Sequence, residues 1–223
     1  SIVWLRKHYT GLFKLPPMGE IINSYKEGWS IFVSSLAVNL YTATNVVVLG
    51  MLTNNVIVGY YSAADKLITC VRRGIYAVSD AIYPFISKMM RDDIPKGLQF
   101  IKKQLFLYLI VGLVGCTSLF FFSDTIVRLL FGADYDLTVD VLRILSFVPL
   151  AVAISTVFGE ETMLPLNMNS AYSRTLVLGA FFSLISIFPL CYLWGAKGVA
   201  ITMLLTEFLI MIIMGGLLRK QLF

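Results

Sequence analysis

The sequence has little charge, one histidine and few cysteines. Charged residues make up 14% of its 223 residues, against about a quarter in soluble domains. The single histidine, His8, excludes a histidine-based metal or catalytic cluster by count alone. Cys70, Cys116 and Cys191 lie singly in apolar segments with no CxxC spacing, so we expect buried thiols that act as small hydrophobic side chains. No GxxxxGK[ST] motif occurs, which excludes a P-loop in this chain, and no cofactor is implied.

Hydrophobic residues, in contrast, make up 58% of the sequence and give a mean hydropathy of +0.81. Whole segments of about 20 residues are apolar on all sides, as in helices surrounded by lipid. We therefore predict an all-α integral membrane protein, with about six transmembrane helices in one bundle over residues 28–218. The expected spans are residues 29–52, 57–88, 105–123, 141–161, 176–194 and 198–217, of which the fourth should be bent by Pro149. Residues 1–27 are expected to form a cytoplasmic linker or surface segment, and residues 219–223 a cytoplasmic tail.

The orientation follows from lysine and arginine, which are enriched on the cytoplasmic side of membranes. The N-terminal segment, the connections after the second and fourth spans, and the C-terminus together carry twelve basic residues. The remaining connections carry few, and the longest of them, residues 124–140, contains four aspartates. We therefore expect both termini in the cytoplasm, which requires an even number of spans.

The second span carries five charged side chains in 17 residues: Asp65, Lys66, Arg72, Arg73 and Asp80. At 100° per residue they fall, with Tyr76, within a wedge of about 140° on one side of a helix. Small apolar residues occupy the opposite side, where we expect a neighbouring helix to pack closely. A charge in a membrane span normally faces a bundle interior or a water-filled cavity.

Two other spans carry polar residues that add to this pattern. Ser34, Tyr41 and Asn45 fall on one face of the first span, which suggests a cavity shared with the second. Glu207 lies in the middle of the last span, so it needs a partner or a proton, and it is the candidate for ion coupling.

Two interpretations of the charged span remain open at this point. The charges line a cavity and contact a substrate or an ion, or they form structural pairs with other helices. Pairing within the helix does not account for them, because Asp65 and Arg72 lie two turns, or about 10 Å, apart. Guanidinium groups bind phosphate oxygens bidentately, and tyrosine, asparagine and serine side chains suit sugars. A proton-coupled drug exporter could use the same residue types.

Several stretches resemble a known family of membrane proteins. The sequences "NLYTATNVVVLGML", "VGYYSAADKL" and "DAIYPFISK" resemble the seventh and eighth spans of bacterial Wzx O-antigen flippases, of the multidrug/oligosaccharidyl-lipid/polysaccharide (MOP) exporter superfamily. The stretches "LLFGADYDLTVDVLRIL" and "GAKGVAITMLLTEFLIMIIM" resemble the connection between the ninth and tenth spans and the final span. Family members are about twice this length and have two facing bundles. The resemblance therefore implies that this chain, which begins at Ser1 rather than Met, is the second bundle of a longer protein.

The same resemblance implies a function without covalent chemistry. Lipopolysaccharide O-antigen units linked to undecaprenyl diphosphate would cross the inner membrane by alternating access, driven by an ion gradient. Arg72 and Arg73 would meet the diphosphate, while Asp65, Lys66 and Asp80 would tune the field or form pairs. Expected partners are the lipid bilayer, the missing N-terminal bundle, and the polymerase and chain-length regulator of the O-antigen pathway, with no nucleic acid.

Three other functions compete with this one. The chain could belong to an exporter of another lipid-linked glycan or of drugs, although drug export would favour carboxylates over paired arginines. An O-antigen polymerase would need a larger external loop than the 17 residues of 124–140. A structural half without transport activity is the third alternative.

Overall fold

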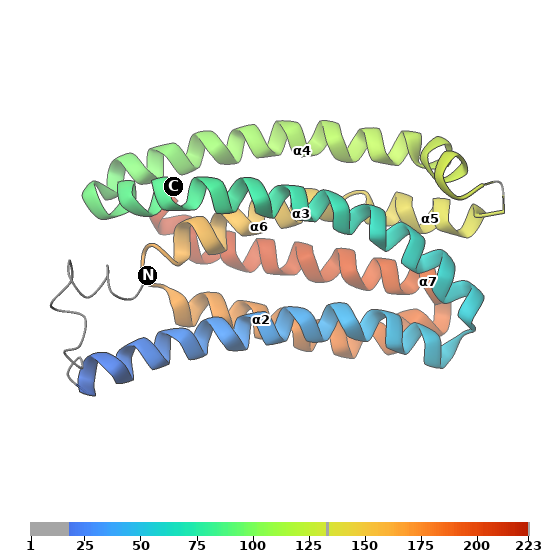
Figure 1. Cartoon of the computed structure of the whole chain (residues 1–223), viewed down its shortest axis with the longest axis horizontal. Helices are drawn as coiled ribbons and strands as arrows, with labels where there is room; N and C mark the ends of the chain where they lie inside the picture. The colour runs from blue at the N-terminus through green and yellow to red at the C-terminus, as the bar shows by residue number, and fades with distance from the viewer. Residues whose placement is uncertain (1–17, 133, 223) are drawn as a thin grey trace, which may run out of the picture.

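The computed structural model describes the backbone of residues 18–132 and 134–222, and in this part the chain is helical with no strand (Figure 1). The side chains of residues 20–24, 26, 27, 30, 31, 220 and 222 are outside the description. The helices, in chain order, are α2 (Met18–Leu52), α3 (Asn55–Asp92), α4 (Ile94–Phe131), α5 (Asp136–Leu145), α6 (Val148–Phe158), the π-helical turn η1 (Gly159–Met163) and α7 (Asn169–Leu222). The predicted linker, residues 1–27, lies mostly outside the described residues.

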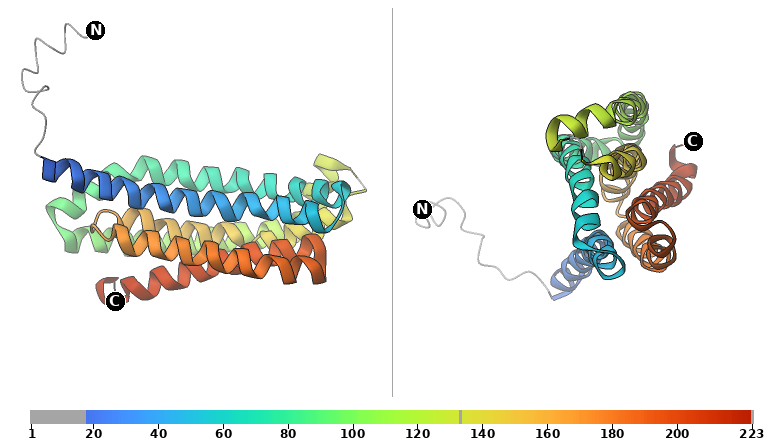
Figure 2. Two further views of the ribbon diagram at one scale, coloured as in Figure 1. Left: turned by 90° about the horizontal axis from the view of Figure 1, so that it is seen from below. Right: turned by 90° about the vertical axis from the view of Figure 1, so that its right-hand side faces the viewer.

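The helices run antiparallel along one long axis, so that the connections gather at two ends (Figures 1 and 2). The α3–α4 connection at Asp93, the connection 164–168 and the C-terminus share one end, which we call the terminal end. The α2–α3 turn, the link between α4 and α5, and a kink in α7 share the other, which we call the distal end. In the predicted topology the terminal end is cytoplasmic.

Local capping signals fix two of these connections. Asn54 begins α3, because its side-chain Oδ1 accepts a hydrogen bond from the Ile57 backbone N–H at 3.0 Å. Asp93 begins α4 in the same way, accepting from the Lys96 N–H at 3.2 Å. The hydrogen bond from the Lys96 side chain lowers the pKa of the Asp93 carboxyl group. Both caps let the chain reverse direction within two residues.

The kink in α7 divides it into two legs, residues 169–194 and 196–222, at Gly195. Gly195 has φ +54° and ψ −129°, a conformation that side-chain-bearing residues rarely adopt. At Gly198 an added Cβ would overlap the backbone oxygen of Leu190, so the second leg can return along the first only with glycine there. These glycines lie where the sequence places the end of the fifth predicted span and the start of the sixth.

Four helical stretches are long and apolar enough to cross a membrane: Phe32–Leu52, Ile94–Phe131, Asp136–Met163 and Asn169–Arg219. The all-α membrane fold is thereby confirmed. The last stretch contains both legs of α7 and is long enough for two crossings at 1.5 Å per residue. The charged α3 is not among the four. The helix is broken at residues 146–147, and Pro149 lies in the first turn of α6, which agrees with the bend expected in the fourth predicted span.

The core consists of two apolar clusters, one toward each end of the bundle. The distal cluster includes Ile68, Leu142 and Met203, and the terminal cluster includes Ile86, Met163 and Ile210. Arg72 lies between Ile68 and Ile86 on α3, and Glu207 lies between Met203 and Ile210 on α7. A layer of polar side chains therefore separates the two clusters near mid-length of the bundle.

One expectation about the interior is wrong. Cys116 and Cys191 are buried, but Cys70 is exposed. It belongs to the small-residue face of α3, where Val71 and Val78 are also exposed. This face does not pack closely on α4, because a cavity of about 350 Å³ lies between the two helices. Hydropathy did not separate the outer surface from the interior, since both are apolar in a membrane protein.

Candidate functional site

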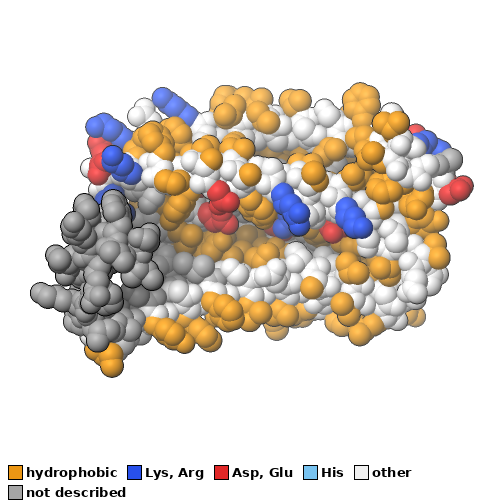
Figure 3. All heavy atoms as spheres, viewed as in Figure 1, with side chains coloured by type: hydrophobic (Ala, Val, Ile, Leu, Met, Phe, Trp, Pro, Cys, Tyr) orange, Lys and Arg blue, Asp and Glu red, His pale blue; other side chains and the backbone are white. Residues whose placement is uncertain are grey.

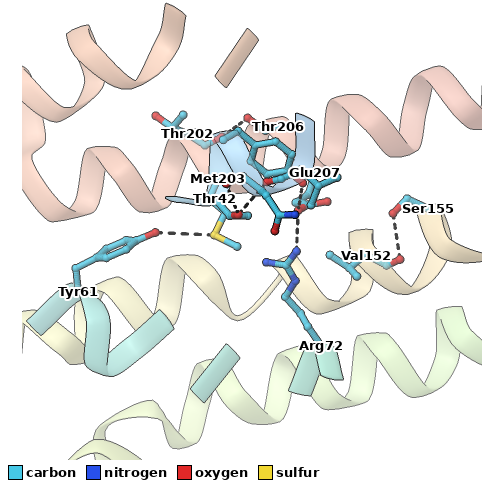
Figure 4. A network of polar contacts seen from close by, with 12 residues as sticks. Thr42, Tyr61, Arg72, Val152, Ser155, Thr202, Met203, Thr206 and Glu207 are labelled. Atoms are coloured by element: carbon cyan, nitrogen blue, oxygen red, sulfur yellow. Dashed lines mark hydrogen bonds and ion pairs between the residues drawn. The ribbon is translucent and has the colours of Figure 1, made fainter. Parts of the chain in front are cut away.

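An ion pair links α3 to α7 in the polar layer. The Arg72 Nη2 atom lies 3.4 Å from the Glu207 Oε1 atom, and both side chains are buried. Tyr41 on α2 donates a hydrogen bond of 2.9 Å to the same oxygen. Figure 4 shows Arg72 reaching from α3 across to Glu207. Glu207 thus has the partner that the sequence required, and three helices meet at it.

Four other predicted site residues lie on the inner side of the same helices. Tyr76 is half-buried and, with Tyr41 and Glu207, lines a cavity of about 50 Å³. Asn45 is buried next to Tyr61, and Ser34 is buried on α2. Asp65 is half-buried on α3, one turn toward the distal end from Thr69. The structure therefore brings Arg72, Tyr76, Tyr41 and Glu207 together, while Asn45 and Asp65 lie nearer the distal end.

The remaining predicted residues lie on the outer surface of the bundle. Lys66, Arg73 and Asp80 are all exposed, and their spacing of seven residues places them on one face of α3. Figure 3 shows basic and acidic side chains in a row at mid-length, where the surrounding surface is mainly apolar and uncharged. The two adjacent arginines therefore point to different surroundings: Arg72 into the bundle and Arg73 out of it.

The sequence analysis missed a second buried carboxylate, Glu161, in the π-helical turn η1. Glu161 is fully buried; Ser79 Oγ donates to its Oε1 atom and Gln104 Nε2 to its Oε2 atom, each at 2.6 Å. No basic side chain of the described residues forms an ion pair with it. The preceding residue, Glu160, is half-buried and lines two cavities together with Tyr172 on α7. The sequence signal that could have indicated this site is the pair of adjacent carboxylates, Glu160 and Glu161, at the end of an apolar run.

The polar layer combines charged side chains with side chains that carry hydroxyl groups. No group of three histidine, cysteine, aspartate or glutamate side chains in the described part of the chain could hold a metal ion. The layer instead offers one buried ion pair, two further carboxylates and several tyrosine hydroxyls. Such intramembrane charges mark substrate or ion pathways in membrane proteins.

Comparison with known proteins identifies related sequences but no related solved structure. The family described as "Polysaccharide biosynthesis protein" matches residues 1–90. A "Putative O-antigen transporter" of Escherichia coli (strain K12) is 32% identical over 202 residues, which cover 91% of this chain and 49% of the relative. A protein of the same name from Shigella dysenteriae is 30% identical over 214 residues, which cover 96% of this chain and 53% of the relative. No solved structure matches this chain.

The chain spans about half the length of these curated relatives. Similarity to both extends over nearly all of it, so the relationship includes the helices that carry Arg72, Arg73 and Glu207. The match over residues 1–90 and the similarity to two O-antigen transporters thereby confirm the resemblance to Wzx-type flippases that the sequence motifs predict.

Proposed function

We propose that this chain forms one bundle of a flippase in the bacterial inner membrane. Its substrate would be an O-antigen or related polysaccharide unit carried on undecaprenyl diphosphate. A second bundle, in the part of the relatives that this chain does not cover, would form the opposite wall of the transport cavity. The transport of O-antigen extends to this chain what the names of its relatives say of them, and the lipid carrier and the flippase activity are what the resemblance of its sequence motifs implies.

The observation that carries the proposal is the exposed row of Lys66, Arg73 and Asp80. A charge that faces lipid at mid-membrane costs a few kcal/mol, so the three charges of this row on one face would be costly. A facing bundle and a water-filled cavity would remove that cost. The row would then line the cavity, with Lys66 and Arg73 offering two cationic groups to a diphosphate.

Arg72 would have a different role in this arrangement. Its guanidinium group is turned toward Glu207 and away from the exposed row. We therefore assign contact with the diphosphate to Arg73 and Lys66, and treat Arg72 as a residue that positions α3 against α7. Glu207 would be the group at which an ion gradient acts, because it is the carboxylate of that pair.

The experiment is complementation of a strain that lacks its own O-antigen transporter, with the complete gene. Surface O-antigen and the amount of protein in the membrane are measured for each variant. The Lys66→Ala, Arg73→Ala double variant should lose most O-antigen display at unchanged abundance, and Arg73→Lys should lose part of it, because lysine lacks the bidentate geometry. Lys103→Ala, an exposed cation near the terminal end of α4, is the matched control. Normal display by the double variant would contradict the proposal.

A further inference from the structure

We propose that Glu160 passes protons between the terminal end of the bundle and the buried Glu207, through three adjoining cavities. The proposal rests on the proposed function, because it names the coupling ion and a residue that handles it. Glu160 takes no part in the ion pair between Arg72 and Glu207.

The innermost cavity connects Glu160 to Glu207. It has a volume of about 50 Å³ and is lined by both carboxylates together with the hydroxyl-bearing Tyr41, Tyr76 and Tyr172. A polar cavity of this size has room for a few water molecules, each of which needs two or more polar partners. Water and tyrosine hydroxyls can therefore bridge the two carboxylates.

Two larger cavities continue from Glu160 to the terminal end. The middle one, about 330 Å³, shares Glu160 and Tyr172 with the innermost cavity. The outer one, about 460 Å³, shares Tyr83 and Leu164 with the middle cavity and reaches the exposed Asn167 in the connection 164–168. The lining residues shared at both junctions show that the three cavities adjoin one another in this order.

Glu160 is the one carboxylate in the described chain that lines both the innermost and the middle cavity. The π-helical turn explains its position. Leu164 N–H donates to the Gly159 carbonyl at 3.1 Å, a bond that spans five residues, and Thr162 Oγ1 donates to the Val157 carbonyl at 2.7 Å. The turn directs Glu161 toward Ser79 and Gln104 and leaves Glu160 facing the cavities. π-Helical turns inside α-helices occur frequently at functional sites.

The described groups around Glu160 are acids and hydroxyls that can exchange protons, and they include no lysine or arginine side chain that would pair with Glu160 permanently. α3 contributes Asp80, Tyr76 and Tyr83, α2 contributes Tyr41, and α7 contributes Tyr172 and Glu207, with Glu161 adjacent on the same turn. No described lysine or arginine lines the innermost or middle cavity; Arg72 is bound to Glu207, and Arg91 lines only the outer one. Glu160 would take a proton from water on one side and release it to water on the other, so that only O–H bonds form and break.

Access to Glu160 is tested with cysteines. In a variant of the complete protein with Cys70, Cys116 and Cys191 replaced, Glu160→Cys is compared with Glu161→Cys, using a small cationic methanethiosulfonate reagent. Glu161 is the matched control, because it is fully buried against Ser79 and Gln104. Glu160→Cys should react about tenfold faster or more, since only an accessible thiolate reacts. Equal rates would overturn the proposal.

Protonation is tested on the unsubstituted protein with dicyclohexylcarbodiimide, which modifies carboxyl groups only in their protonated form. Peptide mass spectrometry should find Glu160 modified, and the modification should fall severalfold as the pH rises from about 6 to about 9. Sodium chloride at constant pH should not protect it. Protection by sodium would identify a metal-cation site instead, and absence of modification at every pH would also overturn the proposal.

The transport measurement links the path to the proposed function. Glu160→Gln, which cannot carry a proton, should reduce O-antigen display about tenfold or more at unchanged abundance, whereas Glu160→Asp should keep most of it. Full display by Glu160→Gln would overturn the proposal. If the labelling results hold but the unsubstituted protein does not restore O-antigen, the proposed function fails and the proton path stands. If O-antigen is restored but Glu160 is inaccessible, the path fails and the function stands.

Discussion

Arg72 and Arg73 are adjacent in the sequence, but Arg72 is buried 3.4 Å from Glu207 while Arg73 is exposed on the outer face of α3. The 100° between successive residues of a helix separates them. One arginine therefore contributes to the packing of α3 against α7, and the other belongs to the charged row on the surface. Substitutions at the two positions should have different effects.

The first prediction concerns stability. Arg72→Ala should lower the free energy of unfolding by about 3–5 kcal/mol, because Glu207 loses its cationic partner while remaining buried. Arg73→Ala should change it by less than about 0.5 kcal/mol, as is usual for exposed positions. Thermal unfolding of the purified proteins in detergent measures both. Adding Glu207→Gln to Arg72→Ala should recover most of the loss, and failure of that second change would show that the pair is not what Arg72 stabilises.

The second prediction concerns the hydrogen bond from Tyr41 to Glu207. Tyr41→Phe keeps the ring but removes a donor at 2.9 Å from a charged acceptor, so it should cost about 1.5–3 kcal/mol of stability. Tyr192→Phe on α7, where the side chain is 81% exposed, is the control and should have almost no effect. Equal melting temperatures for the two variants would mean that the Tyr41 hydroxyl does not bind Glu207.

Local sequence signals predicted an all-α chain, and two of its helix breaks lie near proline or glycine. Pro149 and the Gly195–Gly198 stretch act through the backbone, by a fixed φ, a missing N–H or a positive φ, and these effects do not depend on distant residues. The polar wedge on α3 is divided between the interior, which Arg72 and Ser79 face, and the outer surface, where Arg73 and Asp80 lie. Its orientation could not be read, because helical periodicity gives the angles between side chains but not the direction of the bundle axis. Ile68 and Arg72, one helical turn apart, both lie on the inner side.

Features that depend on contacts between distant segments were missed. Glu161 appeared only as the end of a predicted span. No local pattern indicates that a π-helical turn will change the direction in which the side chains of residues 159–163 point. Its partners, Ser79 and Gln104, come from helices 82 and 57 residues away in the sequence. Cys70 was placed in the interior because an apolar residue suits lipid and protein interior equally.

The third prediction tests the orientation. The cysteine-free protein should react with an impermeant thiol reagent from the periplasm when a cysteine is placed at Asn55 or Asp136, which are exposed at the distal end, and should not react at Lys96. Asn55 is preferred to Asn54, because the Asn54 side chain caps α3. Labelling at Lys96 from outside the cell would reverse the predicted topology.

The fourth prediction concerns the return of α7 on itself. Gly198→Ala should destabilise the protein strongly, because the new Cβ would overlap the Leu190 backbone oxygen, which cannot move without displacing the helix that contains it. Gly216→Ala, in the same leg with no atom within 4 Å of the added Cβ, is the matched control. It should be neutral or raise stability by up to about 1 kcal/mol, because alanine favours the helix over glycine. Thermal unfolding and membrane abundance measure both variants, and a Gly198→Ala protein as stable as the Gly216→Ala protein would contradict the close approach of the two legs.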